Sequence, residues 1–218
     1  VVYTPAIPKD MGELVYVQEK GYRVIKRSRM LGEIAQGQRC MAVAGTHGKT
    51  TTSTLVSHLF TDSGEGCSAF LGGISKNYDS NLLTHANDVI VAEADEFDRS
   101  FLQLFPEIAV ITSMDADHLD IYGDEAHIRE AFKAFASQVS GTVIVRHGLD
   151  ITCEDTKARI MTYGYNEADA DFYAEPLEGG HFNLHHPGGV IEDCVVGIPG
   201  WVNIENGTAA AAIALTYG

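Results

Sequence analysis

The sequence has few basic residues for its length and no long uninterrupted apolar run. Among its 218 residues, 15 are Lys or Arg and 30 are Asp or Glu, which gives a formal net charge of −15. This balance disfavours nucleic acid and anionic membrane surfaces as partners, because both are negatively charged. With no run of about 18 apolar residues, no membrane-spanning helix is predicted. Phosphate ligands stay compatible, since a bound divalent metal can neutralise them locally.

The sequence also lacks paired cysteine motifs and a leader segment. Its four cysteines show no C-x-x-C pair and no histidine at zinc-finger spacing: Cys40, Cys67, Cys153 and Cys194. Such scatter favours buried free thiols in a reducing cytosol over a disulfide framework. The chain starts at Val1 rather than Met, without a basic, apolar and small-residue leader. We therefore expect a piece or a processed form of a longer cytoplasmic protein.

Nearly continuous apolar runs mark the expected strands of the central part. They cover 40–44, 88–93, 108–112 and 142–145. Strands of a parallel sheet read in this way when helices cover both of its faces. The spacing of these runs leaves room for a helix after most of them. The pattern thus predicts a mostly parallel, doubly wound α/β sheet.

Helical patterns lie between and after these strands. One helix is expected to run to about Phe60, a second over 125–139 and an Ala-rich third over 203–216. Apolar residues of the second helix recur at spacings of three and four, which predicts one buried stripe. The stripe consists of Ile128, Ala131, Phe132, Phe135, Ala136 and Val139.

The two flanks of this pattern differ from it. Residues 1–38 read as a strand, a loop, a short strand near 21–25 and a short helix near 27–34, with Ser28 as its N-cap. Residues 35–38 read as a boundary, so two domains are predicted, 1–38 and 39–218. From about residue 159 the pattern changes to short strands with glycine turns. These strands are expected to be antiparallel: 159–164, 170–175, 181–186 and 190–197.

A loop with two glycines joins the first apolar strand to its helix. Its residues are Gly45, Thr46, His47, Gly48, Lys49, Thr50 and Thr51. Glycines let backbone N–H groups close around phosphate oxygens, and the helix N-terminus adds the positive end of a dipole. Lys49 is expected to meet the β- and γ-phosphates of ATP, and the Thr50 hydroxyl to bind Mg²⁺. The loop is shorter than the Walker pattern, because Val43 stands where that pattern begins with glycine. A plain glycine turn before a helix is the alternative.

Four carboxylates follow the second apolar run: Glu93, Asp95, Glu96 and Asp98. Ligands of open α/β sheets bind at the carboxyl ends of strands. Packed carboxylates need a cation to stay ionised, and Mg²⁺ prefers hard oxygen ligands. The cluster therefore suits a magnesium–ATP complex. A solvated acidic loop with Arg99 pairing one of the acids is the alternative.

His118 follows the third apolar run, in the sequence Asp115-Ala116-Asp117-His118-Leu119-Asp120. A lone histidine is more often structural than a ligand. This one lies among acids at a strand end, beside the two motifs already named. We therefore count it as a candidate for the same site.

Together these motifs resemble the Mur ligase family. G-T-H-G-K-T-T-T begins at Gly45, E-A-D-E-F-D-R-S-F at Glu93 and A-D-H-L-D at Ala116, while Phe97 stands where many members carry a small residue. The resemblance implies an ATP-dependent amide ligase of peptidoglycan precursor synthesis. It would join L-alanine to UDP-N-acetylmuramate through an acyl phosphate. By the same resemblance, Lys49, Glu93 and His118 are catalytic, and Thr50, Glu93 and His118 bind the metal.

The end of the chain also resembles the family. Residues 199–206 are similar to the motif G-x-H-N-x-x-N, with Val202 in place of the histidine. The resemblance implies that Asn203 and Asn206 bind the adenine of ATP, since both offer a donor and an acceptor to a base edge. The alternative is that Asn203 only caps the helix.

Resemblance also assigns the flanks of the phosphate loop. Gly72-Gly73, expected after a short strand, is similar to the glycine pair near the muramyl substrate. Residues 24–34 resemble the link between the UDP-binding and ATP-binding domains. It follows that 1–38 would be the remnant of the UDP-binding domain and 39–218 the central ATP-binding domain. The C-terminal domain would be missing, so the isolated piece is expected to be inactive.

Lys133 stands where many Mur ligases carry a carbamylated lysine, about fifteen positions after the histidine. The alanine-adding branch generally lacks that lysine, and Lys133 lies off the apolar stripe, so a solvated surface lysine is expected. Other readings stay open for the whole chain. One is a sister ligase that uses murein tripeptide or folate, and another is an ATP-binding module without ligase activity.

Overall fold

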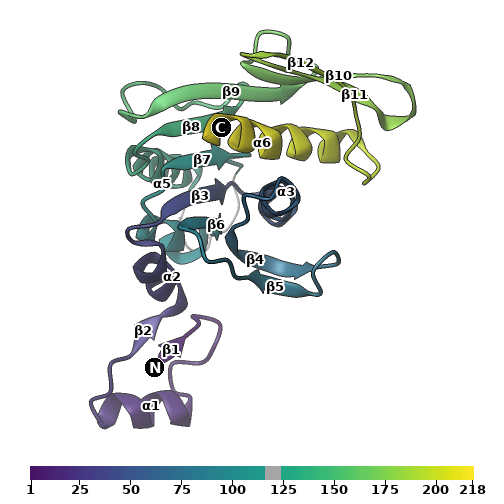
Figure 1. Ribbon diagram of the computed structural model, residues 1–218. Helices are drawn as coiled ribbons and strands as arrows, with labels where there is room; N and C mark the ends of the chain where they lie inside the picture. The colour runs from purple at the N-terminus through teal and green to yellow at the C-terminus, as the bar shows by residue number, and fades with distance from the viewer. Residues whose placement is uncertain (116–123) are drawn as a thin grey trace.

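Figure 1 shows a computed structural model of the protein, which describes residues 1–115 and 124–218. In the described part, ten strands form one sheet with helices on both faces. In spatial order the strands are β12 (Gly189–Cys194), β11 (Phe182–His186), β10 (Phe172–Pro176), β9 (Arg159–Tyr165), β8 (Thr142–Arg146), β7 (Ile108–Ile111), β3 (Arg39–Ala44), β6 (Val89–Ala94), β4 (Ser68–Ser75) and β5 (Ser80–Leu83). The predicted α/β class is confirmed.

The strands from β4 across to β10 are parallel, and hairpins close both ends of the sheet. β5 pairs antiparallel with β4, and β11 and β12 pair antiparallel beyond β10. The antiparallel arrangement predicted from residue 159 onward is wrong for its first two strands. β9 pairs parallel with β8, and β10 pairs parallel with β9.

The parallel pairing of β10 depends on a short return of the chain. Residues 166–171 lead back along β9, and Asn166 takes a positive φ of 57°. The Asp171 carboxylate accepts a 2.7 Å hydrogen bond from the Thr162 N–H and a 3.2 Å bond from its hydroxyl. Side-chain bonds that tie down such a return are hard to infer from glycine spacing. The sequence pattern therefore did not predict that residues 166–171 join two parallel strands.

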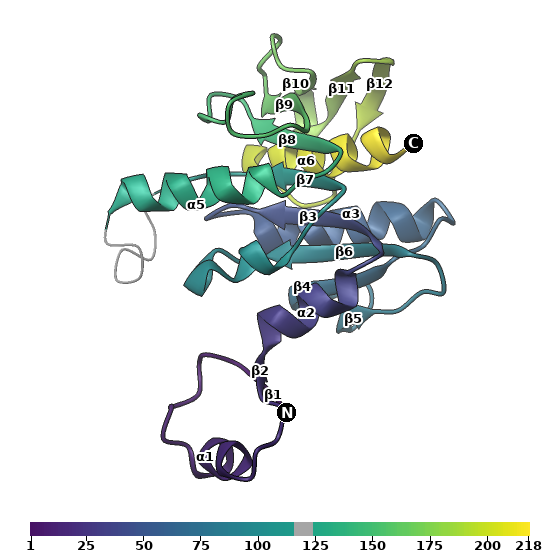
Figure 2. The ribbon, with the colours of Figure 1, turned by 90° about the vertical axis from the view of Figure 1, so that its left-hand side faces the viewer.

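Helices divide between the two faces of the sheet, as Figures 1 and 2 show. The helices α3 (Lys49–Asp62) and α6 (Trp201–Tyr217) lie on one face. On the other face lie α2 (Arg27–Ala35), the 3-10 helix η1 (Phe97–Gln103) and α5 (Glu125–Ser137). The helices bury apolar side chains against the sheet on each of its two faces. This is why the central strands read as continuous apolar runs.

Successive residues of β3 serve opposite cores. Met41 and Val43 pack with α3 and α6, whereas Ala42 and Ala44 pack with the helices of the other face. Alanines at these points leave room for large aromatic side chains from the covering helices. Such alternation is the normal consequence of a pleated strand between two layers.

Three phenylalanines fill the core on the face of the sheet that α2, η1 and α5 cover. Phe101 of η1 stacks on Phe135 with ring centroids 5.1 Å apart, and meets Phe132 edge-on at 5.3 Å. Phe132 and Phe135 belong to the stripe predicted on α5, and all six stripe residues are buried. The stripe is therefore confirmed, and it fixes η1 against the sheet.

The N-terminal residues form a small unit that projects from the sheet (Figures 1 and 2). It contains β1 (Val2–Tyr3), α1 (Gly12–Glu19) and β2 (Ile25–Lys26), and the two strands pair in parallel. Helix α1 was not predicted, and the strand expected near 21–25 is limited to β2. Ser28 is not the N-cap of α2, because the helix already begins at Arg27 and Lys26 occupies the cap position.

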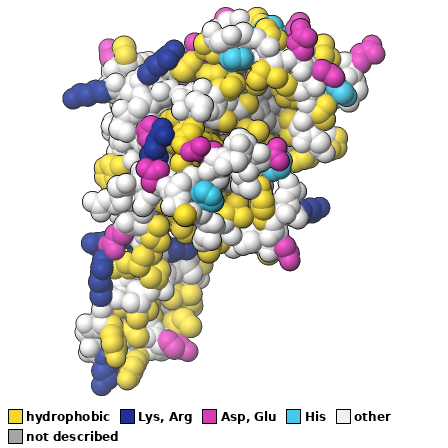
Figure 3. Space-filling view, viewed as in Figure 1, with side chains coloured by type: hydrophobic (Ala, Val, Ile, Leu, Met, Phe, Trp, Pro, Cys, Tyr) yellow, Lys and Arg dark blue, Asp and Glu magenta, His cyan; other side chains and the backbone are white. Residues whose placement is uncertain are grey.

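Exposed apolar side chains gather on this unit, and Figure 3 shows them along its surface. They include Val1, Val2, Met11, Tyr16 and Tyr22. At the other end of the sheet, β12 exposes Val190 and Ile191, its register with β11 is irregular, and Asp193 has a φ of 55°. Among the helices at 1–115 and 124–218, none has both the length and the apolar character that a membrane crossing needs.

Truncating Phe132 to alanine is expected to lower the free energy of unfolding by about 3–5 kcal/mol, because it leaves a cavity under α5. Urea unfolding followed by circular dichroism measures this loss. The matched control is Phe105→Ala, since the Phe105 side chain is 72% exposed. Equal stability losses in the two variants would contradict the assignment of Phe132 to the core.

The four cysteines differ in accessibility, which refines the prediction of buried thiols. Cys40 and Cys67 are buried, and burial raises the pKa of their thiols to about 12 and about 11. Cys153 is exposed, which contradicts the prediction at that position, and Cys194 is half-buried.

A thiol reagent at pH 8 is expected to modify Cys153 first, and Cys40 and Cys67 only on unfolding. Peptide mapping after timed labelling tests this order, and early labelling of Cys40 would contradict it.

Candidate functional site

The carboxyl ends of β3, β6 and β7 meet at one edge of the sheet. Ala44, the last residue of β3, pairs with Ala94 of β6 on one side and with Ile111 of β7 on the other. The segments that follow these strands therefore lie together, as predicted for the glycine loop and the acidic segment. His118 lies outside the described residues.

The glycine loop passes very close to the end of β7. Gly45 has a φ of 137°, and a Cβ built on it would lie 2.0 Å from Oγ1 of Thr112. Gly48 has a φ of 81°, and its Cβ would lie 2.7 Å from Oδ1 of Asn206 on α6. A side chain at either position would thus meet both backbone strain and a steric clash. The two glycines let the loop fit between β7 and α6.

Ser113 holds the middle of the loop. Its hydroxyl accepts a 2.9 Å hydrogen bond from the His47 N–H and lies 2.8 Å from the Thr46 hydroxyl. Its carbonyl oxygen accepts from the Thr46 N–H at 3.3 Å. The His47 imidazole is exposed, and its Nε2 lies 3.7 Å from a carboxylate oxygen of Asp115. Ser113 was not singled out from the sequence, because a serine after a strand carries no distinguishing pattern.

The N-terminus of α3 has no side-chain cap. Gly48 occupies the cap position and has no side chain that could accept a bond. The backbone N–H groups of the first turn, Gly48 to Thr51, therefore have no acceptor within the helix or from a cap. Because the helix dipole places its positive end here, this turn is suited to bind an anion such as phosphate.

Lys49 is held by a buried ion pair. Its Nζ lies 2.7 Å from the Gly45 carbonyl oxygen and 2.7 Å from Oε2 of Glu96. The side chains of Lys49 and Glu96 are 13% and 2% exposed. Two of the three ammonium N–H groups thus have acceptors among the described residues. Glu96 was noted in the sequence as one acid of four, and nothing there distinguished it as the partner of Lys49.

Thr50 and Glu93, both predicted to bind a metal, contact each other. The Thr50 hydroxyl lies 3.1 and 3.0 Å from the two carboxylate oxygens of Glu93. The backbone N–H of Gly72 donates a 2.8 Å hydrogen bond to Oε2 of the same carboxylate. A hydroxyl and a carboxylate beside the glycine loop are the hard oxygen ligands that Mg²⁺ prefers. Gly72 and Gly73 were expected to follow a short strand. They lie within β4 instead.

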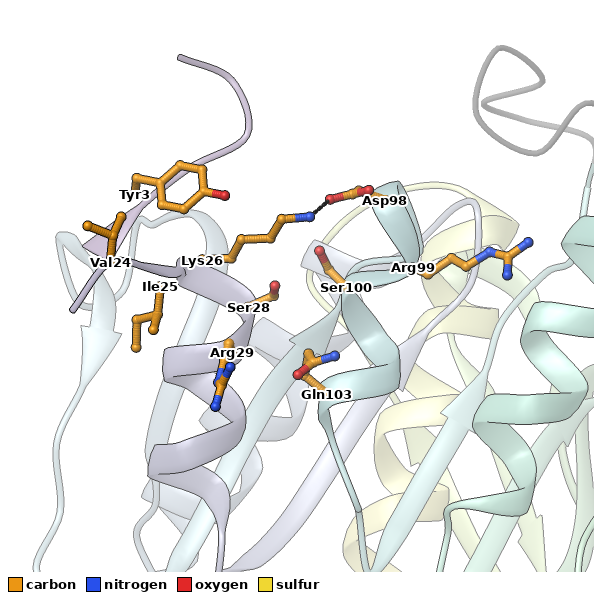
Figure 4. Close-up of a pocket in the computed structure, with 10 residues that line it drawn as sticks. All are labelled: Tyr3, Val24, Ile25, Lys26, Ser28, Arg29, Asp98, Arg99, Ser100 and Gln103. Carbon is orange, nitrogen blue, oxygen red and sulfur yellow. Dashed lines mark hydrogen bonds and ion pairs between the residues drawn. The ribbon is translucent and has the colours of Figure 1, made fainter. Parts of the chain in front are cut away.

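The four acids do not form a single cluster, which corrects the sequence interpretation. Asp98 turns toward the N-terminal unit and pairs with Lys26. This pair borders a pocket of about 340 Å³ between that unit and η1, and Figure 4 shows Arg99 directed away from it. Asp98 and Arg99 have φ values of 53° and 54°, and this turn separates Asp98 from Glu93 and Glu96. Glu93 and Glu96 instead contact the glycine loop, through Thr50 and Lys49.

The two asparagines of α6 have different surroundings. Asn206 is buried, its Oδ1 accepts a 3.4 Å bond from the Thr52 hydroxyl, and the same atom lies beside Gly48. The Asn203 amide donates to the Pro199 carbonyl oxygen at 2.7 Å. The alternative that Asn203 caps the helix is wrong, because Gly200 occupies the cap position.

Lys133 is partly exposed and ion-paired. Its Nζ lies 3.2 Å from Asp150 and 3.4 Å from Asp155, and its side chain is 31% exposed. The hydrogen bond to Asp150 and the charges of both acids raise the pKa of Lys133. The predicted surface position of Lys133 is compatible with this exposure, whereas its two acidic partners were not predicted. These acids lie in the loop after β8, which the helical pattern of α5 alone does not reveal.

Comparison with known families matches residues 43–214 to the Mur ligase middle domain. The chain belongs to the Mur ligase family. The matched stretch includes the glycine loop, Glu93 and both asparagines of α6, so the resemblance seen in the motifs is confirmed.

Two curated relatives in this family share one name. The chain is 47% identical over 222 aligned positions to UDP-N-acetylmuramate–L-alanine ligase of Porphyromonas gingivalis, with 98% of this chain and 49% of the relative covered. It is 48% identical to the ligase of the same name from Parabacteroides distasonis, covering 100% of this chain and 49% of the relative. The chain therefore spans about half the length of the curated relatives it matches.

Solved structures of Mur ligases share the fold. UDP-N-acetylmuramate-alanine ligase from Thermotoga maritima superposes with a TM-score of 0.84 at 24% identity, covering 100% of this chain and 51% of that chain. UDP-N-acetylmuramate:L-alanyl-gamma-D-glutamyl-meso-diaminopimelate ligase from Neisseria meningitides reaches 0.86 at 21% identity, covering 100% and 74%.

Replacing Lys49 with methionine is expected to lower the free energy of unfolding by about 3–5 kcal/mol, because the buried Glu96 carboxylate loses its ammonium partner. The double variant Lys49→Met/Glu96→Gln removes both charges and is expected to regain part of this stability. Denaturant unfolding of the two variants and the wild type measures the difference. A Lys49→Met protein as stable as the wild type would contradict the importance of the pair.

Proposed function

We propose that the full-length protein is an ATP-dependent ligase that joins L-alanine to UDP-N-acetylmuramate in cytoplasmic peptidoglycan precursor synthesis. The observation that carries this proposal is the edge where β3, β6 and β7 end. There an uncapped helix turn, a partly buried lysine and a hydroxyl–carboxylate pair converge. Identity of 47–48% to relatives named for this reaction supports the choice of substrates.

The residues present fit ATP and Mg²⁺. The N–H groups of the first turn of α3 would bind phosphate oxygens, and Lys49 would add the positive charge they need. Thr50 and Glu93 would hold the metal, and His118 stays a predicted third ligand. Asn206 would contact the adenine of ATP. The close approach of its Oδ1 to Gly48 supports a second role, in which the same amide holds the glycine loop in place. Asn203 would contact the adenine.

The chemistry follows from what these residues can stabilise. The lactyl carboxylate of UDP-N-acetylmuramate is activated by phosphorylation, for which ATP supplies the phosphoryl group. The amine of L-alanine then attacks the acyl phosphate, and the tetrahedral adduct releases phosphate to leave an amide. Transfer of a phosphoryl group depends mainly on positioning and charge neutralisation. Lys49 and the first turn of α3 supply fixed positive charge where negative charge develops.

We further propose that residues 39–218 form the central ATP-binding domain and that 1–38 belong to the preceding UDP-binding domain. The ten-stranded sheet begins at Arg39, and the small sheet of β1 and β2 is separate from it. The exposed apolar side chains of the N-terminal unit support this division. They are the residues that a larger domain would cover.

Sister ligases are the main alternative. Structural likeness does not distinguish them, because the ligase from Neisseria meningitides and FolC from E. coli also share the fold, the latter with a TM-score of 0.66. The decision therefore depends on substrates rather than on architecture.

The direct test is phosphate release by the full-length protein with Mg²⁺, ATP, UDP-N-acetylmuramate and a panel of amino acids. Release is expected to require both the sugar nucleotide and L-alanine.

Thr50→Val is expected to lower kcat/KM by about 100-fold, because it removes a metal-supporting hydroxyl. The matched control is Thr61→Val near the far end of the same helix, whose hydroxyl donates to the Ser57 carbonyl oxygen. Release that depends on a peptide or a folate would instead assign the protein to a sister ligase.

A further inference from the structure

The Glu93 carboxylate is held from two directions. Thr50 approaches both of its oxygens from α3, and the Gly72 N–H donates to Oε2 at 2.8 Å from β4. Pairing between β4 and β6 runs from Ser68 to Phe70. Beyond that point the Gly72 N–H serves a side chain of β6 instead of its backbone.

Gly72 also leaves the space that this carboxylate occupies. A Cβ built on Gly72 would lie 2.4 and 2.6 Å from the two carboxylate oxygens of Glu93. No side chain can be added there while Glu93 keeps its place. The neighbouring Gly73 differs, because its Cβ would meet only the Thr50 methyl group, at 3.3 Å.

The group that must yield is the end of a flexible side chain. Gly72 is absent from the residues with positive φ, so alanine can adopt its backbone conformation. Gly72 is exposed and Glu93 is half-buried, so the carboxylate has solvent to move into. An added methyl group would therefore displace the carboxylate without disrupting the strand.

We propose that Gly72 is a positioning residue of the metal site. Its N–H orients the Glu93 carboxylate, and its missing side chain keeps that carboxylate beside Thr50. This role rests on the proposed function, in which Glu93 and Thr50 hold Mg²⁺ next to the phosphates of ATP. Replacing a partner that orients a metal ligand typically weakens metal binding by about 10- to 100-fold.

The test is direct binding of Mn²⁺, a paramagnetic substitute for Mg²⁺, in the presence of ADP. Electron paramagnetic resonance measures the free ion, so the readout does not depend on turnover. Gly72→Ala is expected to weaken Mn²⁺ binding by about 10- to 100-fold, with a thermal midpoint close to that of the wild type. Gly12→Ala is the matched control, because its added methyl group meets nothing within 4 Å.

A double-variant cycle separates positioning from other effects. Glu93→Gln removes the charge that Gly72 orients, so adding Gly72→Ala to it is expected to cause no further loss of Mn²⁺ affinity. Additive losses would overturn the proposal, because Gly72 would then act by another route.

The remaining outcomes are equally decisive. Wild-type affinity in Gly72→Ala would overturn the positioning role while leaving the proposed function intact. A Gly72→Ala protein that fails to fold would also overturn it, since moving a flexible side chain does not cost the fold. A wild-type protein that binds no Mn²⁺ with ADP would remove the proposed metal site itself.

Discussion

The buried ion pair between Lys49 and Glu96 is the contact on which the rest of the site depends. It joins the first residue of α3 to the segment after β6, so two elements separated by 47 positions share one charge pair. A carboxylate that is 2% exposed needs a compensating cation, and the lysine provides it. The same ammonium group also donates to the Gly45 carbonyl oxygen, so it lies at the start of the glycine loop.

This arrangement is possible because small residues crowd the same region. Gly45 approaches Thr112, Gly48 approaches Asn206, and Gly72 approaches Glu93, each at a distance that a Cβ would not permit. At each of these three positions glycine leaves room for a neighbouring side chain. Precision at the site thus comes from close backbone packing as much as from the side chains that perform the chemistry.

Much of the central sheet could be predicted because its physical causes are local. The apolar runs of β3, β6 and β7 and the stripe of α5 each follow from residues close in sequence. The phosphate loop and its pairing with the acidic segment follow from the rule that parallel strands end at one edge. Three contacts could not be predicted, because each joins residues that belong to different elements of the fold. They are the ion pair of Lys49 with Glu96, the hydrogen bonds of Ser113 to the glycine loop and the ion pairs of Lys133. The direction of β9 and β10 was missed for a similar reason.

The strand β12 is the outermost strand at one end of the sheet. An open strand offers unpaired backbone groups that another sheet could extend, and Val190 and Ile191 would favour such contact. The irregular register with β11, the left-handed Asp193 and the adjacent acid Glu192 twist and charge this strand instead. An irregular register and charged side chains are features that generally discourage a further strand from pairing with such an edge.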